Sequence, residues 1–224
     1  MEKEVTQRNN SRNKLRRKGN REGFLRRKKE ENVILIDGEN FVHKLVENLR
    51  RQGLLKSRSD LTKVDMLQLM SFAKKPTINY YSTTVRVSSE SELFDKAQEL
   101  MEWNEKWTPQ LVAQGVNIIK AGYLRGRDGK TCPNCGVKSE ILLEKGVDVR
   151  IAVDIIWLAN KKHHIYVLSS DTDLMPAIER AVSTGCAVTY VAFPGETVES
   201  MERMASETIL LTDEQIKKAF REAK

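Results

Sequence analysis

The sequence predicts an α/β protein with a mainly parallel central sheet and helices on both faces. Two observations lead to this prediction. Short apolar runs alternate along the chain with longer segments of helical periodicity. The first run, Val33–Ile36, is apolar throughout and ends at Asp37-Gly38, which indicates a buried parallel strand followed by a turn.

The first half of the chain supplies three strands and three helices. Residues 40–52 carry apolar side chains at helical spacing, Phe41, Leu45 and Leu49. A second helix is expected at 63–74, after capping Ser, Thr and Asp residues and before Pro76. Alternating apolar residues predict a strand at 78–87, and a serine-rich cap precedes a long helix expected at 91–114. A further strand is expected at 116–120.

The second half begins with residues 122–145, which are rich in glycine and contain a Cys pair. We expect an irregular insertion there. Strands and helices then alternate again, with strands at 164–169, 186–191 and 208–210 and helices at 147–160, 173–183, 197–205 and 213–223. The expected organisation is an arm at 1–31, a domain at 32–211 and a C-terminal helix at 212–224.

Composition excludes several classes of protein. The chain has 224 residues, of which 31% are charged and 40% hydrophobic, as is usual for a soluble globular protein. No run approaches the roughly 18 apolar residues of a membrane span, so an integral membrane protein is excluded. Three cysteines argue against a disulfide framework and for a reducing, cytoplasmic compartment.

The positive charge is concentrated in the arm. Residues 1–30 hold 12 Lys or Arg and 4 Asp or Glu, a net charge of +8, although the whole chain carries only +7. Such a segment is expected to be disordered alone and to bind a polyanion through counterion release. The alternative is a solubilising tail, and a membrane surface is disfavoured because the arm lacks a lipid-facing stripe. The candidate phosphate contacts are Arg16, Arg17, Lys18, Arg26, Arg27, Lys28 and Lys29.

Carboxylates stand where expected strands end and expected helices begin. Asp37 follows the first strand, Asp171 and Asp173 follow the strand at 164–169, and Asp148 lies where the helix at 147–160 begins. If these strands are neighbours, the four acids meet at one edge of the sheet. Their repulsion favours a bound cation, and hard oxygen ligands suit Mg²⁺ or Mn²⁺.

Each of these acids also has a structural interpretation. Asp148, Asp171 and Asp173 are suited to cap the helices that follow them. Asp37 is harder to explain in this way, because a carboxylate that closes a buried strand is desolvated. Asn40 is either an ordinary residue of the first helical turn or a group that holds Asp37 and an attacking water.

Three blocks of the sequence, VILIDGEN, EKGVDVRIAVDI and YVLSSDTDLMPAI, resemble the signature blocks of the NYN domain. This is the LabA/DUF88-like branch of the PIN-like nucleases, and the resemblance spans residues 32–193. It implies a Rossmann-like PIN fold and a metal-dependent ribonuclease that uses clustered aspartates. By motif position it implies site roles for Asp37, Asn40, Asp148, Asp154, Asp171 and Asp173.

Two features qualify the carry-over of residues from this family. Leu174 stands where the family usually has an aromatic residue, a change that is conservative for packing. Asp154 lies six positions after Asp148, about 240° around an ideal helix, so both cannot point at one metal. We therefore expect Asp154 to support the site or the fold rather than to bind the ion.

The pair Cys132 and Cys135, in the sequence CPNCG, has the form of half a tetrahedral zinc site. Cys186 is expected in the core, so the remaining ligands would come from His or Asp nearby or from the other copy of a homodimer. A tight turn without metal and a redox pair are the alternatives. Arg125, Arg127 and Lys130 of the same segment, and Lys145 after it, could contact a single strand or simply be solvated.

The resulting hypothesis is a divalent-metal ribonuclease, expected to be endonucleolytic, whose basic arm grips RNA, with single-stranded RNA favoured. A second hypothesis is a non-catalytic RNA-binding regulator on the same fold. A third is another metal-dependent phosphate-ester hydrolase, such as a phosphatase or a Toprim-type nuclease. The Toprim alternative requires a glutamate at the end of the first strand, where this chain has Asp37.

Overall fold

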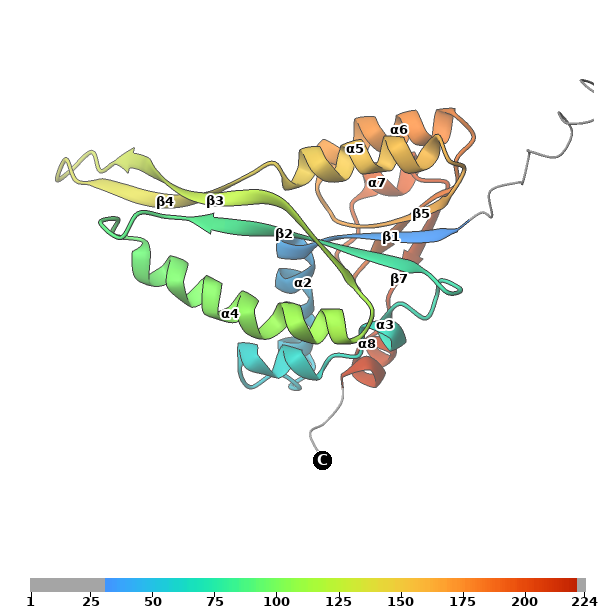
Figure 1. Ribbon diagram of the computed structural model, residues 1–224, viewed down its shortest axis with the longest axis horizontal. Coiled ribbons are helices and arrows are strands. Elements are labelled where there is room, and N and C mark those ends of the chain that lie inside the picture. The colour runs from blue at the N-terminus through green and yellow to red at the C-terminus, as the bar shows by residue number, and fades with distance from the viewer. Residues whose placement is uncertain (1–30, 221–224) are drawn as a thin grey trace, which may run out of the picture.

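The computed structural model describes residues 31–220, and the arm at 1–30 lies outside the described residues. The described chain forms one seven-stranded sheet in the order β4-β3-β2-β1-β5-β6-β7 (Figure 1). All neighbouring strands are parallel except β3 and β4. The strands are β1 Asn32–Asp37, β2 Thr77–Arg86, β3 Asn117–Thr131, β4 Lys138–Lys145, β5 His164–Leu168, β6 Val188–Ala192 and β7 Glu207–Leu210.

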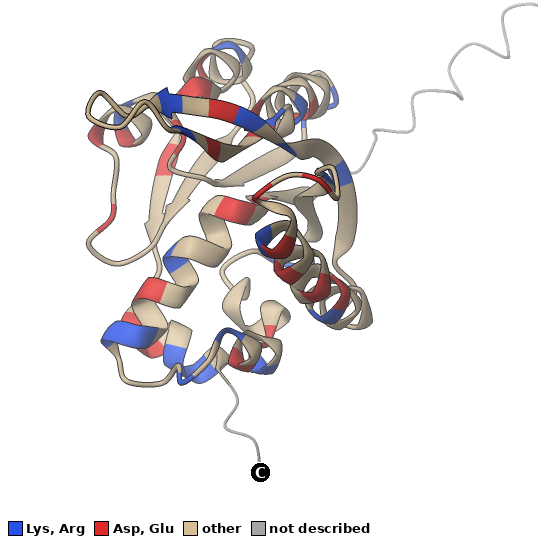
Figure 2. Ribbon diagram, turned by 90° about the vertical axis from the view of Figure 1, so that its left-hand side faces the viewer, with Lys and Arg blue, Asp and Glu red and all other residues tan. Residues whose placement is uncertain are grey.

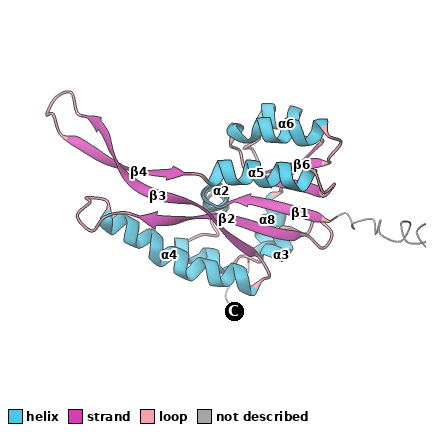
Figure 3. Ribbon diagram, turned by 45° about the horizontal axis from the view of Figure 1, so that its top comes forward, coloured by secondary structure: helices cyan, strands magenta, loops and turns pink. Residues whose placement is uncertain are grey.

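Helices cover both faces of this sheet, as the α/β prediction requires (Figure 3). One face packs against α2 Gly38–Arg51, α3 Met66–Leu69, α4 Phe94–Ala113 and α8 Asp213–Ala219. The other face packs against α5 Val147–Ala159, α6 Met175–Ser183 and α7 Glu199–Met204. Within the described residues no helix is long and apolar enough to cross a membrane.

Strand β1 lies at the centre of the sheet and shows why the two layers form. Ile34 and Ile36 belong to the core under α2 and α4, whereas Val33 and Leu35 belong to the core under α5 and α6. Side chains alternate between the faces of a strand, so a strand covered on both faces must be apolar at every position. The continuous apolar run of the sequence therefore placed this strand correctly.

Aromatic side chains in the core under α2 and α4 fix the position of the start of α2. Trp107 of α4 stacks on Trp103 and donates a hydrogen bond from its indole nitrogen to the Tyr80 hydroxyl at 3.2 Å. That hydroxyl donates in turn to the carbonyl oxygen of Gly38, also at 3.2 Å. The first residue of α2 is thus held against β2, directly beside Asp37.

The helix expected at 63–74 is wrong. The chain instead forms a 3₁₀ helix, η1 Arg58–Lys63, followed by the single turn α3. The Asp60 carboxylate accepts from the backbone nitrogens of Lys56 and Ser57 and pairs with Lys63, which closes η1 on itself. Val64 then adopts an extended conformation and bridges to Phe220, so a continuous helix cannot form.

The irregular insertion expected at 122–145 is also wrong, because this segment is the antiparallel hairpin of β3 and β4. Two of its glycines, Gly122 and Gly129, serve close contact between strands rather than loop freedom. A Cβ atom on Gly122 would collide with the carbonyl oxygen of Lys145, and one on Gly129 would lie 2.6 Å from Ser139 Oγ. Glycine content alone therefore suggested a loop, whereas these two glycines stand at strand positions with no room for a side chain.

The contact at Gly38 yields a prediction about stability. A Cβ atom there would lie 2.7 Å from Tyr80 Cζ and collide with the carbonyl oxygen of Tyr81. We expect Gly38→Ala to lower the free energy of unfolding by about 1–3 kcal/mol, as overpacking of a rigid site does. Urea unfolding measures the change.

The matched control is Gly126→Ala on β3, where the nearest atom to an added Cβ is Ser91 Oγ at 3.5 Å. That variant is expected to differ little from the wild type. Equal unfolding midpoints for the two variants would show that the close approach of β2 does not require glycine at position 38.

Candidate active site

Asp37 lies at the centre of the candidate site, as the last residue of β1 and the N-cap of α2. Its Oδ1 atom accepts from the backbone nitrogen of Asn40 at 3.3 Å, and its Oδ2 atom accepts from Ser169 Oγ at 3.0 Å. Burial raises the pKa of Asp37, with smaller contributions from the charges of Asp171 and Glu39, although the two hydrogen bonds oppose the shift.

The chain that follows β5 is tied to the start of α2 by two hydrogen bonds. Ser169 is buried, and its hydroxyl both donates to Asp37 and accepts from the backbone nitrogen of Asp171 at 3.1 Å. The backbone nitrogen of Ser170 donates to Asn40 Oδ1 at 3.3 Å. Because β1 and β5 are neighbours, their two carboxyl ends form one rigid corner.

Asp171 and Asp173 lie at that corner, in the turn before α6. Asp171 caps the short 3₁₀ helix η2 Thr172–Leu174, and its Oδ1 atom accepts from the backbone nitrogen of Asp173 at 2.9 Å. Asp171 therefore does cap a helix, as its structural interpretation suggested, and Asp37 caps α2 although that interpretation did not extend to it. Asp173 is not a cap, because it lies within η2 and Leu174 is the N-cap of α6. A capping carboxylate keeps further lone pairs for another ligand, so this role does not exclude a second one.

Asp148 is half-buried in the first turn of α5. It is not the N-cap of α5, because Gly146 occupies that position with a φ of 96°. The expectation that Asp148 caps this helix is therefore wrong, and its carboxylate has no such structural role.

Glu144 is a site residue that sequence reasoning missed. It lies near the end of the edge strand β4, and its pKa is raised to about 7, first by burial and then by the charges of Asp37, Glu39, Asp148 and Asp171. Glu144 lines a small pocket together with Gly38 and Glu39, so it lies beside the start of α2, where the charges of these acids act on it. The hairpin brings it there, so an expected irregular insertion gave no reason to single it out.

Asp154 lies in the middle of α5, and its carboxylate already accepts two hydrogen bonds from side chains. Its Oδ2 atom accepts from the Tyr81 hydroxyl at 2.8 Å and from Arg150 Nε at 3.1 Å. The bond from Tyr81 ties α5 to β2, whereas Arg150 pairs with Asp154 within α5. Both contacts fit the supporting role expected for Asp154 rather than direct ligation.

The carboxylates have the chemistry of a site for a hard divalent cation, but their side chains are not closed around an ion. Within residues 31–220, no group of three or more His, Cys, Asp or Glu side chains is disposed to hold a metal. The pKa values of Asp37 and Glu144 are raised first by burial and then by neighbouring carboxylates, so their ionised forms are disfavoured at this edge. A cation there would relieve the repulsion.

The basic candidates on the hairpin share one of its faces. Residues directly opposite each other in an antiparallel pair lie on the same face, and the register pairs Tyr123 with Lys145. Arg125 and Arg127 follow Tyr123 at spacings of two, so they stand on that face, and all three cations are exposed. Glu144 faces the opposite way. Figure 2 shows blue and red positions along this hairpin.

The remaining sequence candidates lie away from this corner. Lys130 is exposed near the hairpin tip, and Cys132 and Cys135 form the tip itself, distant from the buried Cys186. The seven basic candidates of the arm lie outside the described residues.

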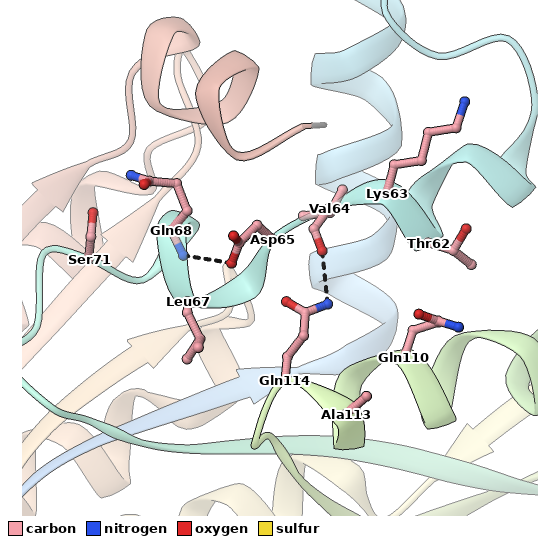
Figure 4. A pocket seen from close by; sticks show the side chains of 10 residues that line it. All are labelled: Thr62, Lys63, Val64, Asp65, Leu67, Gln68, Ser71, Gln110, Ala113 and Gln114. Atoms are coloured by element: carbon pink, nitrogen blue, oxygen red, sulfur yellow. Dashed lines mark hydrogen bonds between the residues drawn. The ribbon is translucent and has the colours of Figure 1, made fainter. Parts of the chain in front are cut away.

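Two hollows of the described surface deserve comparison with the acidic corner. A hollow of about 680 Å³ with a mixed polar and apolar lining lies between η1, α3 and the end of α4. Gln114 there donates to the carbonyl oxygen of Val64 (Figure 4) and accepts from the backbone nitrogen of Met66. This hollow contains none of the candidate residues. A groove of about 560 Å³ runs between α5 and α6, and Asp148 and Asp173 are among the mostly apolar residues that line it.

Comparison with known proteins places this geometry in context. A family model described as NYN domain matches residues 32–212. No curated protein matches the chain. A crystal structure of a protein of unknown function from Vibrio parahaemolyticus is similar, with 19% sequence identity, a TM-score of 0.47, and coverage of 83% of this chain and 94% of that one.

Proposed function

The chain belongs to the NYN domain family, and we propose that it is a divalent-metal-dependent ribonuclease that hydrolyses phosphodiester bonds of RNA. The NYN domain has a nuclease-type, PIN-like fold. The observation that supports the proposal most strongly is that Asp37 and Asp171 follow the neighbouring strands β1 and β5 and are joined through the Ser169 hydroxyl. The charges of Asp37, Asp148 and Asp171 also act on Glu144. In open α/β sheets, ligands bind at the carboxyl ends of the strands.

The proposed residues would hold Mg²⁺ or Mn²⁺ through carboxylate oxygens. Asp37, Asp148, Asp171 and Asp173 are the proposed ligands, and Glu144 is added to them from its position in the structure. When bound, the cation neutralises charge on the phosphate and activates water for in-line attack. Mg²⁺ and Mn²⁺ take oxygen ligands of this kind.

The chain's own residues keep these carboxylates in position. Ser169 fixes Asp37 and the backbone of Asp171 relative to each other, so neither carboxylate has to be ordered when substrate arrives. Asn40 is oriented by Ser170, and its amide N–H groups remain suitable donors for a phosphate oxygen or a water. Preorganised groups of this kind lower the barrier because they need no rearrangement during the reaction.

The proposal favours single-stranded RNA as substrate. The groove beside Asp148 and Asp173 is lined mainly by apolar side chains, which unpaired bases can contact and stacked bases of a duplex cannot. The exposed face with Arg125, Arg127 and Lys145 offers phosphate contacts on the hairpin. Endonucleolytic cleavage is proposed because the groove beside Asp148 and Asp173 is open to the surface rather than enclosed.

The catalytic role of Asp171 can be separated from its capping role. Asparagine caps a helix as well as aspartate does, so Asp171→Asn should keep the hydrogen bond to Asp173 and lose only the charge. We expect cleavage of labelled single-stranded RNA with Mg²⁺ or Mn²⁺ to fall by at least about a hundredfold, and EDTA to abolish it in the wild type.

The matched control is Asp65→Asn, which makes the same change at the N-cap of α3, outside the acidic corner. Its cleavage rate should equal that of the wild type. Binding of RNA without any metal-dependent cleavage by the wild type would favour the non-catalytic regulator instead. Cleavage restricted to DNA or to small phosphate esters would favour another phosphate-ester hydrolase.

The basic arm is proposed to supply affinity for RNA that is independent of sequence. Binding is measured in the Asp171→Asn background, so that the RNA stays intact, with and without residues 2–30. If about six cations of the arm contact phosphates, deletion should make the slope of log affinity against log salt concentration shallower by about 4 for single-stranded RNA.

A variant with the arm residues in scrambled order serves as the control, because counterion release depends on charge and not on sequence. It should retain the slope of the wild type. An unchanged slope after deletion would make the arm a solubility device.

A further inference from the structure

The β3–β4 hairpin extends beyond the rest of the sheet (Figure 1). Strand β2 pairs with β3 only as far as Arg86 opposite Arg125, so from Gly126 to the tip each strand of the hairpin has only the other as partner. An isolated two-stranded hairpin is marginally stable in water. The side chains of Val137 and Ile141 are exposed, so the hairpin also carries uncovered apolar surface. An additional interaction at the tip would account for both the protruding hairpin and this apolar surface.

The tip has the local geometry of a zinc-binding turn. The backbone nitrogen of Cys132 donates to the carbonyl oxygen of Val137 at 2.8 Å, and that of Gly136 donates to the carbonyl oxygen of Cys132 at 2.9 Å. The backbone N–H groups of Cys135 and Asn134 point at the Cys132 sulfur and lower the pKa of its thiol. Hydrogen bonds to sulfur favour the thiolate, which is the form that binds metal.

The chain cannot complete a tetrahedral site from its own cysteines and histidines. Neither residues 1–30 nor 221–224 contain a Cys or a His. Cys186 is buried against the carbonyl oxygen of His163. His43 lies on α2 beside Glu47, His163 accepts from the backbone of Glu31, and His164 contacts Thr189. No third Cys, His, Asp or Glu of the described residues joins the pair.

We propose that Cys132 and Cys135 of two copies of this chain together bind one Zn²⁺, which joins two hairpins tip to tip. A structural zinc site requires four ligands, and an identical pair from a second copy supplies the missing two thiolates. Zn²⁺ displaces the four thiol protons to solvent, and no electron is transferred. Val137 and Ile141 would then lie beside the contact between the copies.

The charge of the tip is consistent with this arrangement. Residues 127–138 contain Arg127, Lys130 and Lys138 against Asp128, a net charge of +2. Two such tips would repel each other if they met without a counterion. A zinc ion with four thiolates carries a net charge of −2 and would lie between them, so the site offsets the repulsion that its formation creates.

The test uses the full chain, kept reduced with a phosphine, loaded with Zn²⁺ and then desalted. Zinc content and molar mass by light scattering are measured on the same sample. We expect a dimer with about one zinc ion per two chains, since four ligands complete the site. Chelation with EDTA should give a metal-free monomer, and added Zn²⁺ should restore the dimer.

Cys135→Ser is expected to be a monomer without zinc, and the control Cys186→Ala, which alters the cysteine outside the tip, should remain a zinc-containing dimer. Circular dichroism checks that each variant is folded. Substitution of Co²⁺ gives a second readout, because the sulfur-to-cobalt charge-transfer absorption scales with the number of thiolates. A monomer with one zinc per chain, a chain that retains no zinc, or a dimer unaffected by EDTA would each overturn the proposal.

Discussion

The crowding of carboxylates at the ends of β1 and β5 is the constraint on which the arrangement of this protein depends. Burial raises the pKa values of Asp37 and Glu144, and the like charges around them raise these values further. The fold compensates locally. Asp37 accepts hydrogen bonds from Asn40 and Ser169, and Asp171 accepts one from Asp173. These bonds hold the acids together, and their remaining repulsion makes the corner receptive to a cation.

The sequence was a good guide wherever burial alone decides structure. Val33–Ile36 is apolar at every position because β1 is covered on both faces, and Asp37 follows because the strand ends at the open edge. The layers of helices, the strand positions beyond residue 160 and the place of Asp171 follow from the same pattern. Local hydrophobicity and helix signals are sufficient for such elements.

The sequence was a poor guide where structure depends on contacts between distant segments. The helix expected at 63–74 fails because Val64 pairs with Phe220, far along the chain. The hairpin was missed because Gly122 and Gly129 serve close strand contacts. Glu144 was missed as a consequence, since only the register of β4 brings it to the acids. Ser169 could be read from the sequence, but not its two simultaneous hydrogen bonds.

The carboxylates of this corner share one negative electrostatic field, which a divalent cation would reduce. The pKa of Glu144 responds to that field. A carboxyl whose pKa is raised from 4.5 to about 7 on folding costs stability progressively as pH rises through that interval. In EDTA, the wild type should therefore lose stability relative to Glu144→Gln between these pH values, and Mn²⁺ should reduce the difference. Parallel stability curves for the two proteins in EDTA, or a difference that Mn²⁺ leaves unchanged, would show that no such shared field exists.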